Sequence, residues 1–167
     1  MKTMLRHSPK AQQGASAMEF ALVLPVFLLI LYGLITFGAA FYTQLAVSRA
    51  AEDGARAAIQ PGITNDMIKA EVINSLATSS IAPRAQNTSF TTRRDWLNTQ
   101  VKPSRVTVVR NTACNGAGST GAVSITVDFP YDNAAGTRIL PSITIPAIGD
   151  IDGWMPKKLV SCATAQI

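Results

Sequence analysis

The stretch FALVLPVFLLILYGLITFGAAFY, residues Phe20–Tyr42, contains no charged side chain. An α-helix rises about 1.5 Å per residue, so about 20 residues of it cross the hydrocarbon core of a bilayer. The apolar region of a secretory signal is shorter, at about 7–15 residues. The run therefore predicts a membrane-spanning helix, and a signal peptide cut near Ala40 is the alternative.

The segment before this run is basic. Lys2, Arg6 and Lys10 precede it, whereas residues 43–48 behind it carry no charge. Because positive charge is retained on the cytoplasmic side of a membrane, the N-terminus is predicted to be cytoplasmic and the rest of the chain exported. The same three residues supply much of the net charge of +5, so the basic balance does not indicate nucleic-acid binding.

The predicted helix continues beyond the membrane and stops at Pro61-Gly62. Small residues recur in this extension at intervals of four, namely Ala46, Ala50, Gly54 and Ala58. A row of this kind lets another backbone approach closely. It packs either on the chain's own domain or against identical or related helices in a bundle, and the sequence leaves both alternatives open.

The exported part has roughly 120 residues, enough for one small domain. A second helix is predicted over residues 65–78, with Asn65 as its N-cap and an apolar stripe along it. Residues 79–104 read as polar and irregular, with Trp96 and Leu97 anchoring them to the core.

The last third of the chain has strand character. Residues 105–110 (RVTVVR) and 123–129 (VSITVDF) alternate and are rich in β-branched side chains. The turn-forming string CNGAGSTG between them predicts a hairpin with a long loop. Residues 143–145 and 158–163 are shorter candidates for strands.

These elements predict an α+β fold. A long N-terminal transmembrane helix extends into the periplasm and packs with a second helix on a small antiparallel β-sheet. The expected parts are a basic leader over residues 1–14, a transmembrane helix over 15–42, a helical extension over 43–61 and a periplasmic α+β domain over 62–167.

The chain has two cysteines, Cys114 and Cys162, and both fall in the exported part. An oxidising compartment permits a disulfide, and two cysteines allow one pairing. We predict this bridge; the alternative is two free buried thiols. The bridge would close a loop of about 48 residues and contribute on the order of 3–4 kcal/mol in the chain-entropy model.

The sequence offers little that catalysis could use. The one histidine, His7, lies in the leader. No HExxH, GxSxG, GxGxxG, P-loop or CxxC pattern occurs, and two distant cysteines without histidine partners do not make a zinc site. We therefore expect no enzymatic activity, no bound metal and no cofactor.

A single carboxylate, Glu19, stands at the start of the apolar run, five residues after Gly14. A charged side chain at mid-span costs about 2.5–3.5 kcal/mol, and less near an interface. Cleavage after Gly14 would create an α-amino group on Ala15, one helical turn from Glu19, and an ion pair between them would offset this cost. The alternative is an interfacial carboxylate with no role.

These residues resemble a type IV prepilin, and more specifically the TadE-like pseudopilins of the tight-adherence (Tad or Flp) pilus system. The resemblance is carried by the pattern GxxxxEF beginning at Gly14, by the following ALVLPVFLLILYGLITFG, and by the Arg- and Ala-rich segment over residues 49–56. It implies that Gly14 precedes the scissile bond and that Ala15 is the mature N-terminus. It also implies that Glu19, with Phe20 beside it, directs processing or subunit docking.

The resemblance implies a minor pseudopilin, a structural and assembly component of a Tad pilus that acts in pilus biogenesis, adherence and biofilm formation. The chain is too long for the major Flp pilin and too short for a TadG-like protein, and TadE and TadF types are not separated. A type II secretion pseudopilin is disfavoured because ASAME follows Gly14 in place of FTLIE-like residues.

The implied partners are a prepilin peptidase, other Tad pilins and pseudopilins, the inner-membrane assembly platform and the membrane, without nucleic acid. The implied location is the bacterial inner membrane, with a single span, a cytoplasmic N-terminus and a periplasmic C-terminal domain, and with incorporation into an extracellular pilus as a further expectation. The alternative is a bitopic inner-membrane protein with an uncleaved anchor and a periplasmic ligand- or protein-binding domain.

Overall fold

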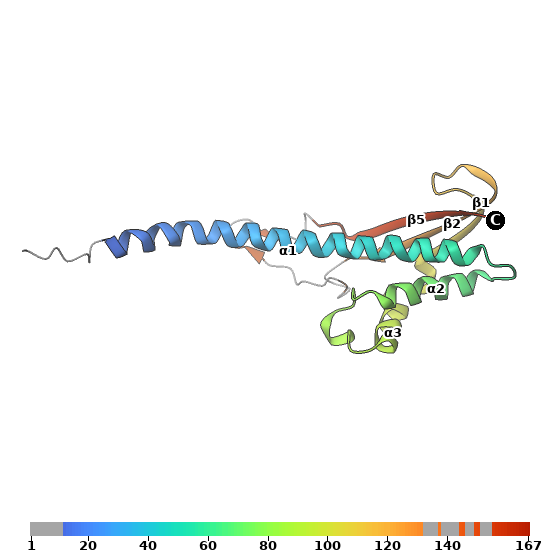
Figure 1. Cartoon of the computed structure of the whole chain (residues 1–167), viewed down its shortest axis with the longest axis horizontal. Helices are drawn as coiled ribbons and strands as arrows, with labels where there is room; N and C mark the ends of the chain where they lie inside the picture. The colour runs from blue at the N-terminus through green and yellow to red at the C-terminus, as the bar shows by residue number, and fades with distance from the viewer. Residues whose placement is uncertain (1–11, 132–136, 138–143, 146–148, 151–154) are drawn as a thin grey trace, which may run out of the picture. The chain divides into compact units, whose positions relative to one another are not determined.

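The structure, a computed structural model, describes residues 12–131, 137, 144–145, 149–150 and 155–167. The helices are α1 (Gln12–Ala58), α2 (Asn65–Thr78) and α3 (Phe90–Gln100), with the short 3-10 helices η1 (Arg84–Gln86) and η2 (Pro103–Arg105). The strands are β1 (Val106–Thr112), β2 (Gly118–Pro130), β3 (Thr144–Ile145), β4 (Gly149–Asp150) and β5 (Lys158–Gln166). These elements, seen in Figure 1, confirm the predicted α+β class.

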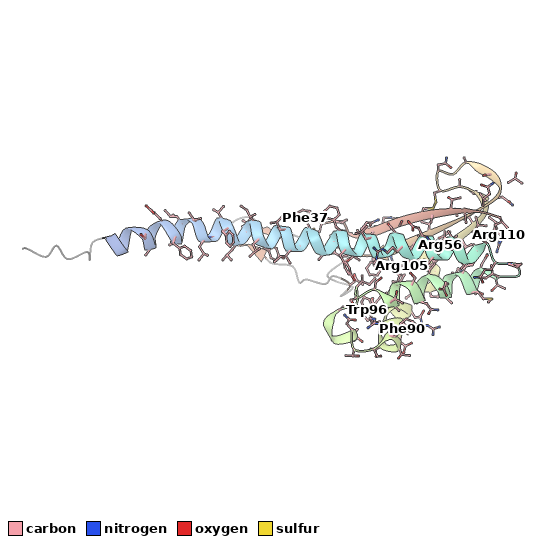
Figure 2. All side chains as sticks on the ribbon, viewed as in Figure 1. Phe37, Arg56, Phe90, Trp96, Arg105 and Arg110 are labelled. Atoms are coloured by element: carbon pink, nitrogen blue, oxygen red, sulfur yellow. A yellow bond between two sulfur atoms is a disulfide. The ribbon has the colours of Figure 1, made fainter. Side chains whose placement is uncertain are left out.

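The chain divides into two compact units, Met1–Gly38 and Ala39–Ile167, and α1 contributes to both. In the first unit, the described side chains of α1 are mostly exposed, and Phe37 is one of those that stand out from the ribbon in Figure 2. Among the described residues, one helical segment, Ser16–Ala58, is long and apolar enough to cross a membrane. This fits a single-pass membrane protein.

The second unit is built on a three-stranded antiparallel sheet in the order β1-β2-β5. In its register, Ile125 of β2 lies opposite Val108 of β1 and Ala163 of β5. The residues of β2 on this face are buried with α2 and the C-terminal part of α1 in one hydrophobic core. β3 and β4 form a separate two-stranded sheet.

The row of small residues on α1 is buried in this core. Ala46, Ala50 and Ala58 are at most 5% exposed. A Cβ atom added to Gly54 would lie 2.5 Å from Cγ2 of Val72 on α2 and 3.3 Å from Cγ2 of Ile125 on β2. The row therefore packs on the chain's own domain, which is the first of the two alternatives left open by the sequence.

The helix predicted over residues 65–78 has these bounds in the structure, but the predicted cap was wrong. Thr64 is the N-cap, and its hydroxyl accepts a hydrogen bond from the backbone N–H of Met67 at 3.3 Å. The side chain of Asn65 accepts a hydrogen bond from the Arg110 guanidinium at 3.3 Å. Asn65 thus ties the start of α2 to β1.

The prediction of an irregular stretch over residues 79–104 was wrong, because it contains α3, η1 and η2. The predicted anchoring was right: Leu97 is fully buried, and Trp96 packs against the core. The side chain of Arg93 donates to the carbonyl oxygen of Ala77 at 2.6 Å, which fixes α3 to the end of α2. This polar helix is therefore held by a few tertiary contacts and by its cap.

Ser89 caps α3, and its hydroxyl accepts a hydrogen bond from the N–H of Thr92 at 3.1 Å. We expect Ser89→Ala to lower the free energy of unfolding by about 1 kcal/mol, because one of the first N–H groups of α3 loses its partner. Urea titration in detergent measures this change. Thr88→Ala, next to the cap and also exposed, is the control, and equal midpoints for the two variants would contradict the role of Ser89.

The predicted hairpin is confirmed, since β1 and β2 pair antiparallel. The loop is shorter than predicted, at residues 113–117, because β1 runs two residues past Arg110 and β2 begins at Gly118, inside the turn-forming string. Asn111 and Gly116 have positive φ angles of 61° and 77°, which allow the chain to bend sharply there. The last predicted strand begins at Lys158, as expected, and runs on to Gln166.

Candidate functional site

The residues that the sequence marks for processing lie at the N-terminal end of α1. The helix begins at Gln12, so the bond between Gly14 and Ala15 falls in its first turn.

Glu19 and Ala15 are four residues apart on α1, so they share one face of the helix about one turn apart. The Glu19 side chain is exposed, and Phe20 beside it is 65% exposed. A carboxylate near the N-terminus of a helix interacts favourably with the helix dipole. By this spacing, we expect an amino group created on Ala15 to lie about one helical turn from the Glu19 carboxylate.

An exposed apolar band follows Glu19 along the first unit. No charged residue occurs between Glu19 and Arg49. The large exposed apolar side chains of this band are Phe20, Leu22, Val23, Leu24, Val26, Phe27, Leu28, Leu29, Ile30, Leu31, Leu34, Ile35 and Phe37. An apolar surface of this extent needs cover from lipid or from other apolar helices, and the carboxylate stands at one end of it.

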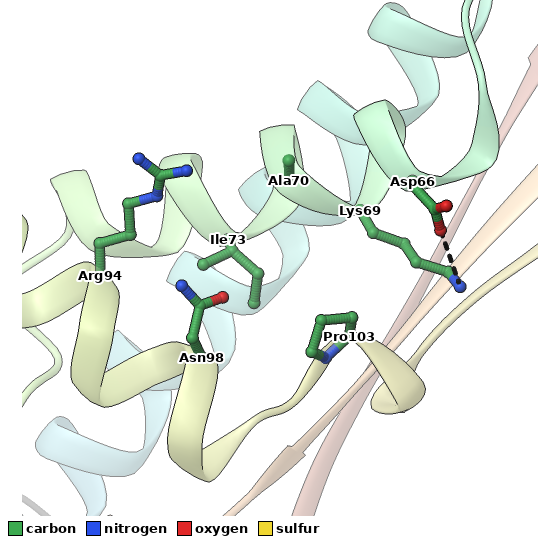
Figure 3. Close-up of a pocket in the computed structure, with 7 residues that line it drawn as sticks. All are labelled: Asp66, Lys69, Ala70, Ile73, Arg94, Asn98 and Pro103. Atoms are coloured by element: carbon green, nitrogen blue, oxygen red, sulfur yellow. Dashed lines mark ion pairs between the residues drawn. The ribbon is translucent and has the colours of Figure 1, made fainter.

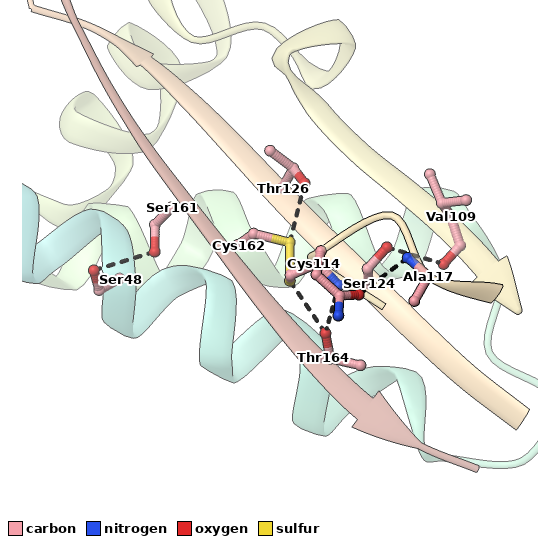
Figure 4. Close-up of a disulfide and its surroundings, with 10 residues drawn as sticks. Ser48, Val109, Cys114, Ala117, Ser124, Thr126, Ser161, Cys162 and Thr164 are labelled. Atoms are coloured by element: carbon pink, nitrogen blue, oxygen red, sulfur yellow. Dashed lines mark hydrogen bonds between the residues drawn. A yellow bond between two sulfur atoms is a disulfide. The ribbon is translucent and has the colours of Figure 1, made fainter. Parts of the chain in front are cut away.

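A disulfide joins Cys114 to Cys162, with their Cα atoms 5.8 Å apart. Figure 4 shows the β1–β2 loop, which carries Cys114, folded across β2 to reach β5. The hydroxyls of Thr126 and Thr164 donate to the sulfurs of Cys162 and Cys114 at 3.2 and 3.1 Å. The sequence predicted the bridge, but nothing in it marked these two threonines as neighbours.

The domain has a shallow pocket between α2 and α3, with a cavity volume of about 190 Å³. Figure 3 shows its lining residues, Asp66, Lys69, Ala70, Ile73, Arg94, Asn98 and Pro103. The ion pair of Lys69 with Asp66, at 3.8 Å, lies at its rim. Small-molecule sites usually occupy about 300–1,000 Å³, so this pocket is small for a ligand site.

A second, wider hollow of about 560 Å³ is an open groove between the end of α1 and α2. Its lining mixes both charges with apolar side chains, namely Asp53, Arg56, Ala57, Gln60, Ile63, Met67 and Glu71. Asp53 accepts a short hydrogen bond from Ser75 at 2.6 Å. Within the described part of the chain, no group of three or more His, Cys, Asp or Glu side chains could hold a metal ion.

Comparison with known families finds a match in the N-terminal part of the chain. Residues 14–56 match the model of the family described as TadE-like protein, over about a quarter of the chain. The match begins at Gly14 and includes Glu19, the apolar band and the small residues Ala46, Ala50 and Gly54, so the predicted TadE-like resemblance is confirmed. No curated protein and no solved structure is significantly similar to the chain.

Proposed function

We propose that this chain is a minor pseudopilin, a structural and assembly component of a Tad pilus with a role in pilus biogenesis, adherence and biofilm formation. The TadE-like match indicates a protein associated with such a pilus. The observation that carries the finer proposal is the position of Gly14. The match starts at this glycine, which lies at the N-terminal end of a membrane-length helix with a carboxylate five residues on.

In this proposal α1 first anchors the precursor in the inner membrane, with Lys2, Arg6 and Lys10 on the cytoplasmic side. A prepilin peptidase cuts between Gly14 and Ala15. The new amino group pairs with Glu19, which allows the start of the helix to lie among the apolar helices of other Tad pilins, pseudopilins or the assembly platform. The function is assembly, without catalysis by this chain.

The exported domain presents a surface to partners in the periplasm or on the pilus. Its fold supports this role because the core is built from the chain's own α1, α2 and sheet. The small-residue row of α1 is used within the domain, so packing between subunits would fall to the apolar band before residue 39. This assigns anchoring and assembly to the first unit and recognition to the second.

The experiment that tests the proposal is substitution of Gly14. We expect Gly14→Val to leave the chain uncleaved, because a branched side chain beside the scissile bond blocks the close approach of a peptidase to the backbone. Intact mass of the chain, produced with and without the cognate prepilin peptidase, measures this. The wild-type chain should lose residues 1–14 only when the peptidase is present.

Gly38→Val is the matched control, since Gly38 lies on the same helix and no atom lies within 4 Å of its Cβ position. It should be cleaved like the wild type. A wild-type chain that keeps its full mass beside an active peptidase would support the alternative, an uncleaved anchor with a periplasmic binding domain. A second experiment tests assembly, by expressing each variant in a strain that lacks this chain. The Gly14→Val chain should not restore pili there.

A further inference from the structure

The second unit brings the start of β5 beside the end of the apolar run. The side-chain amide of Gln44 on α1 donates to the carbonyl oxygen of Val160 at 3.2 Å. The hydroxyl of Ser161 donates to that of Ser48, one helical turn further along α1, at 3.1 Å. β5 therefore runs alongside α1 in the same direction, as Figure 1 also shows.

Because β5 runs in this direction, Lys157 and Lys158 at its start lie beside the part of α1 where the apolar run ends. Lys158 lies two residues before Val160, a distance of about 6–7 Å along a strand. The same distance corresponds to about four residues of helix. Counted back along α1 from Gln44, which contacts Val160, Lys158 therefore lies at the level of Ala40, and Lys157 lies further toward the start of α1. Both lysines are exposed.

Exposed apolar side chains occur at the end of the apolar run on α1 and at the start of β5. Phe41 is 68% exposed, Tyr42 46% and Val160 44%. Among the described residues, the acidic side chain nearest in the sheet register is Asp128, opposite Val160, and it pairs with Arg105 at 3.7 Å. Among the described residues, neither lysine forms an ion pair with an acidic side chain.

We propose that Lys157 and Lys158 bind the phosphates of anionic lipid headgroups where α1 leaves the membrane. The apolar run of the sequence ends at Tyr42, which belongs to the second unit, so we expect this surface to lie at the depth of the headgroups once the run spans a bilayer. Tyr42 fits this position, because tyrosine is enriched at membrane interfaces. The inference rests on the proposed membrane anchoring, and it adds a lipid contact that holds the exported domain against the membrane surface before assembly.

Each lysine near an anionic membrane surface gains about 1 kcal/mol, which is about a fivefold change in a binding equilibrium. The contact should weaken as salt is raised, since the surface potential is screened within about 8–10 Å. It should also be lost when the subunit leaves the bilayer. The lipid contact therefore favours the stored subunit over the assembled one.

The test uses the full chain in nanodiscs and a water-soluble amine reagent, with labelling of each lysine quantified by peptide mass spectrometry. Lys102, which is exposed and lies at the start of η2, is the internal reference. In phosphatidylglycerol discs, we expect Lys157 and Lys158 to react about fivefold more slowly relative to Lys102 than they do in phosphatidylcholine discs. Raising the salt concentration should reduce the difference.

The lipid contact would be overturned if Lys157 and Lys158 reacted as fast as Lys102 in both kinds of disc. It would also be overturned if they reacted more slowly than Lys102 by the same factor in both, since another part of the chain or a second copy would then cover the lysines. Protection by free glycerol phosphate in phosphatidylcholine discs would show a site for soluble anions instead. A chain that does not enter nanodiscs at all would contradict the membrane anchoring itself, which is a different result.

Discussion

Gly54→Leu should destabilise the exported domain by on the order of 3 kcal/mol, an overpacking effect at the upper end of those usually seen in cores. A Cβ atom at this position would already lie 2.5 Å from a methyl group of Val72, and Val72 and Ile125 are both fully buried. Val72 is β-branched and stiff at χ1, so it cannot turn away cheaply. Small domains are stable by about 5–15 kcal/mol, so a large share of the stability would be lost.

The measurement is a urea titration of the detergent-solubilised chain followed by near-ultraviolet circular dichroism, which reports tertiary packing. Gly38→Leu is the matched control, because it makes the same change in the same helix where no atom lies within 4 Å of the Cβ position. The control should unfold at or slightly above the wild-type midpoint, since leucine is a better helix former than glycine. Equal midpoints for Gly54→Leu and Gly38→Leu would show that α1 does not approach α2 and β2 this closely.

Removing the disulfide with Cys114→Ser and Cys162→Ser together should lower the free energy of unfolding by about 3–4 kcal/mol. The bridge spans 48 residues of sequence and fixes both the β1–β2 loop and β5. Without it the unfolded chain gains conformational freedom, while the sheet register of β2 with β5 remains available. The same urea titration measures the loss.

The wild-type chain in a reducing agent is the control for the serine variant, because it breaks the bridge without changing the sequence. Cys114 is exposed, which gives the reagent access. Both samples should unfold at similar urea concentrations, well below the oxidised chain. A double-serine variant within about 1 kcal/mol of the oxidised wild type would mean that the bridge contributes little beyond the sheet itself.

The elements with a strong hydrophobic period could be predicted from the sequence. The bounds of α2 and the pairing of β1 with β2 follow from apolar residues that repeat at helical or strand spacing. α3 was missed because FTTRRDWLNTQ has few apolar residues and three threonines. Its stability comes from contacts that are distant in sequence, such as that of Arg93 with Ala77. The one local signal for it was Ser89, a good N-cap residue.

Some features of the candidate site could also be predicted from the sequence, and others depend on the fold. Gly14, Glu19 and the apolar run are contiguous, so the sequence alone pointed to them and the family match supports the resemblance. The row of small residues around Gly54 could also be recognised in the sequence, but the surface against which it packs could not. Whether such a row faces the same chain or a neighbour depends on which surface the fold brings to it, here Val72 and Ile125. The nearness of Lys158 to the end of the apolar run depends on the fold in the same manner.

The mature N-terminus tests most directly whether this chain is a processed subunit anchored by α1. The measurement is the N-terminal peptide and intact mass of the chain purified from membranes of cells with an active Tad system. We predict a start at Ala15, with Met1–Gly14 removed and α1 retained. A start at Met1, or one near Thr43 with the apolar run gone, would contradict it.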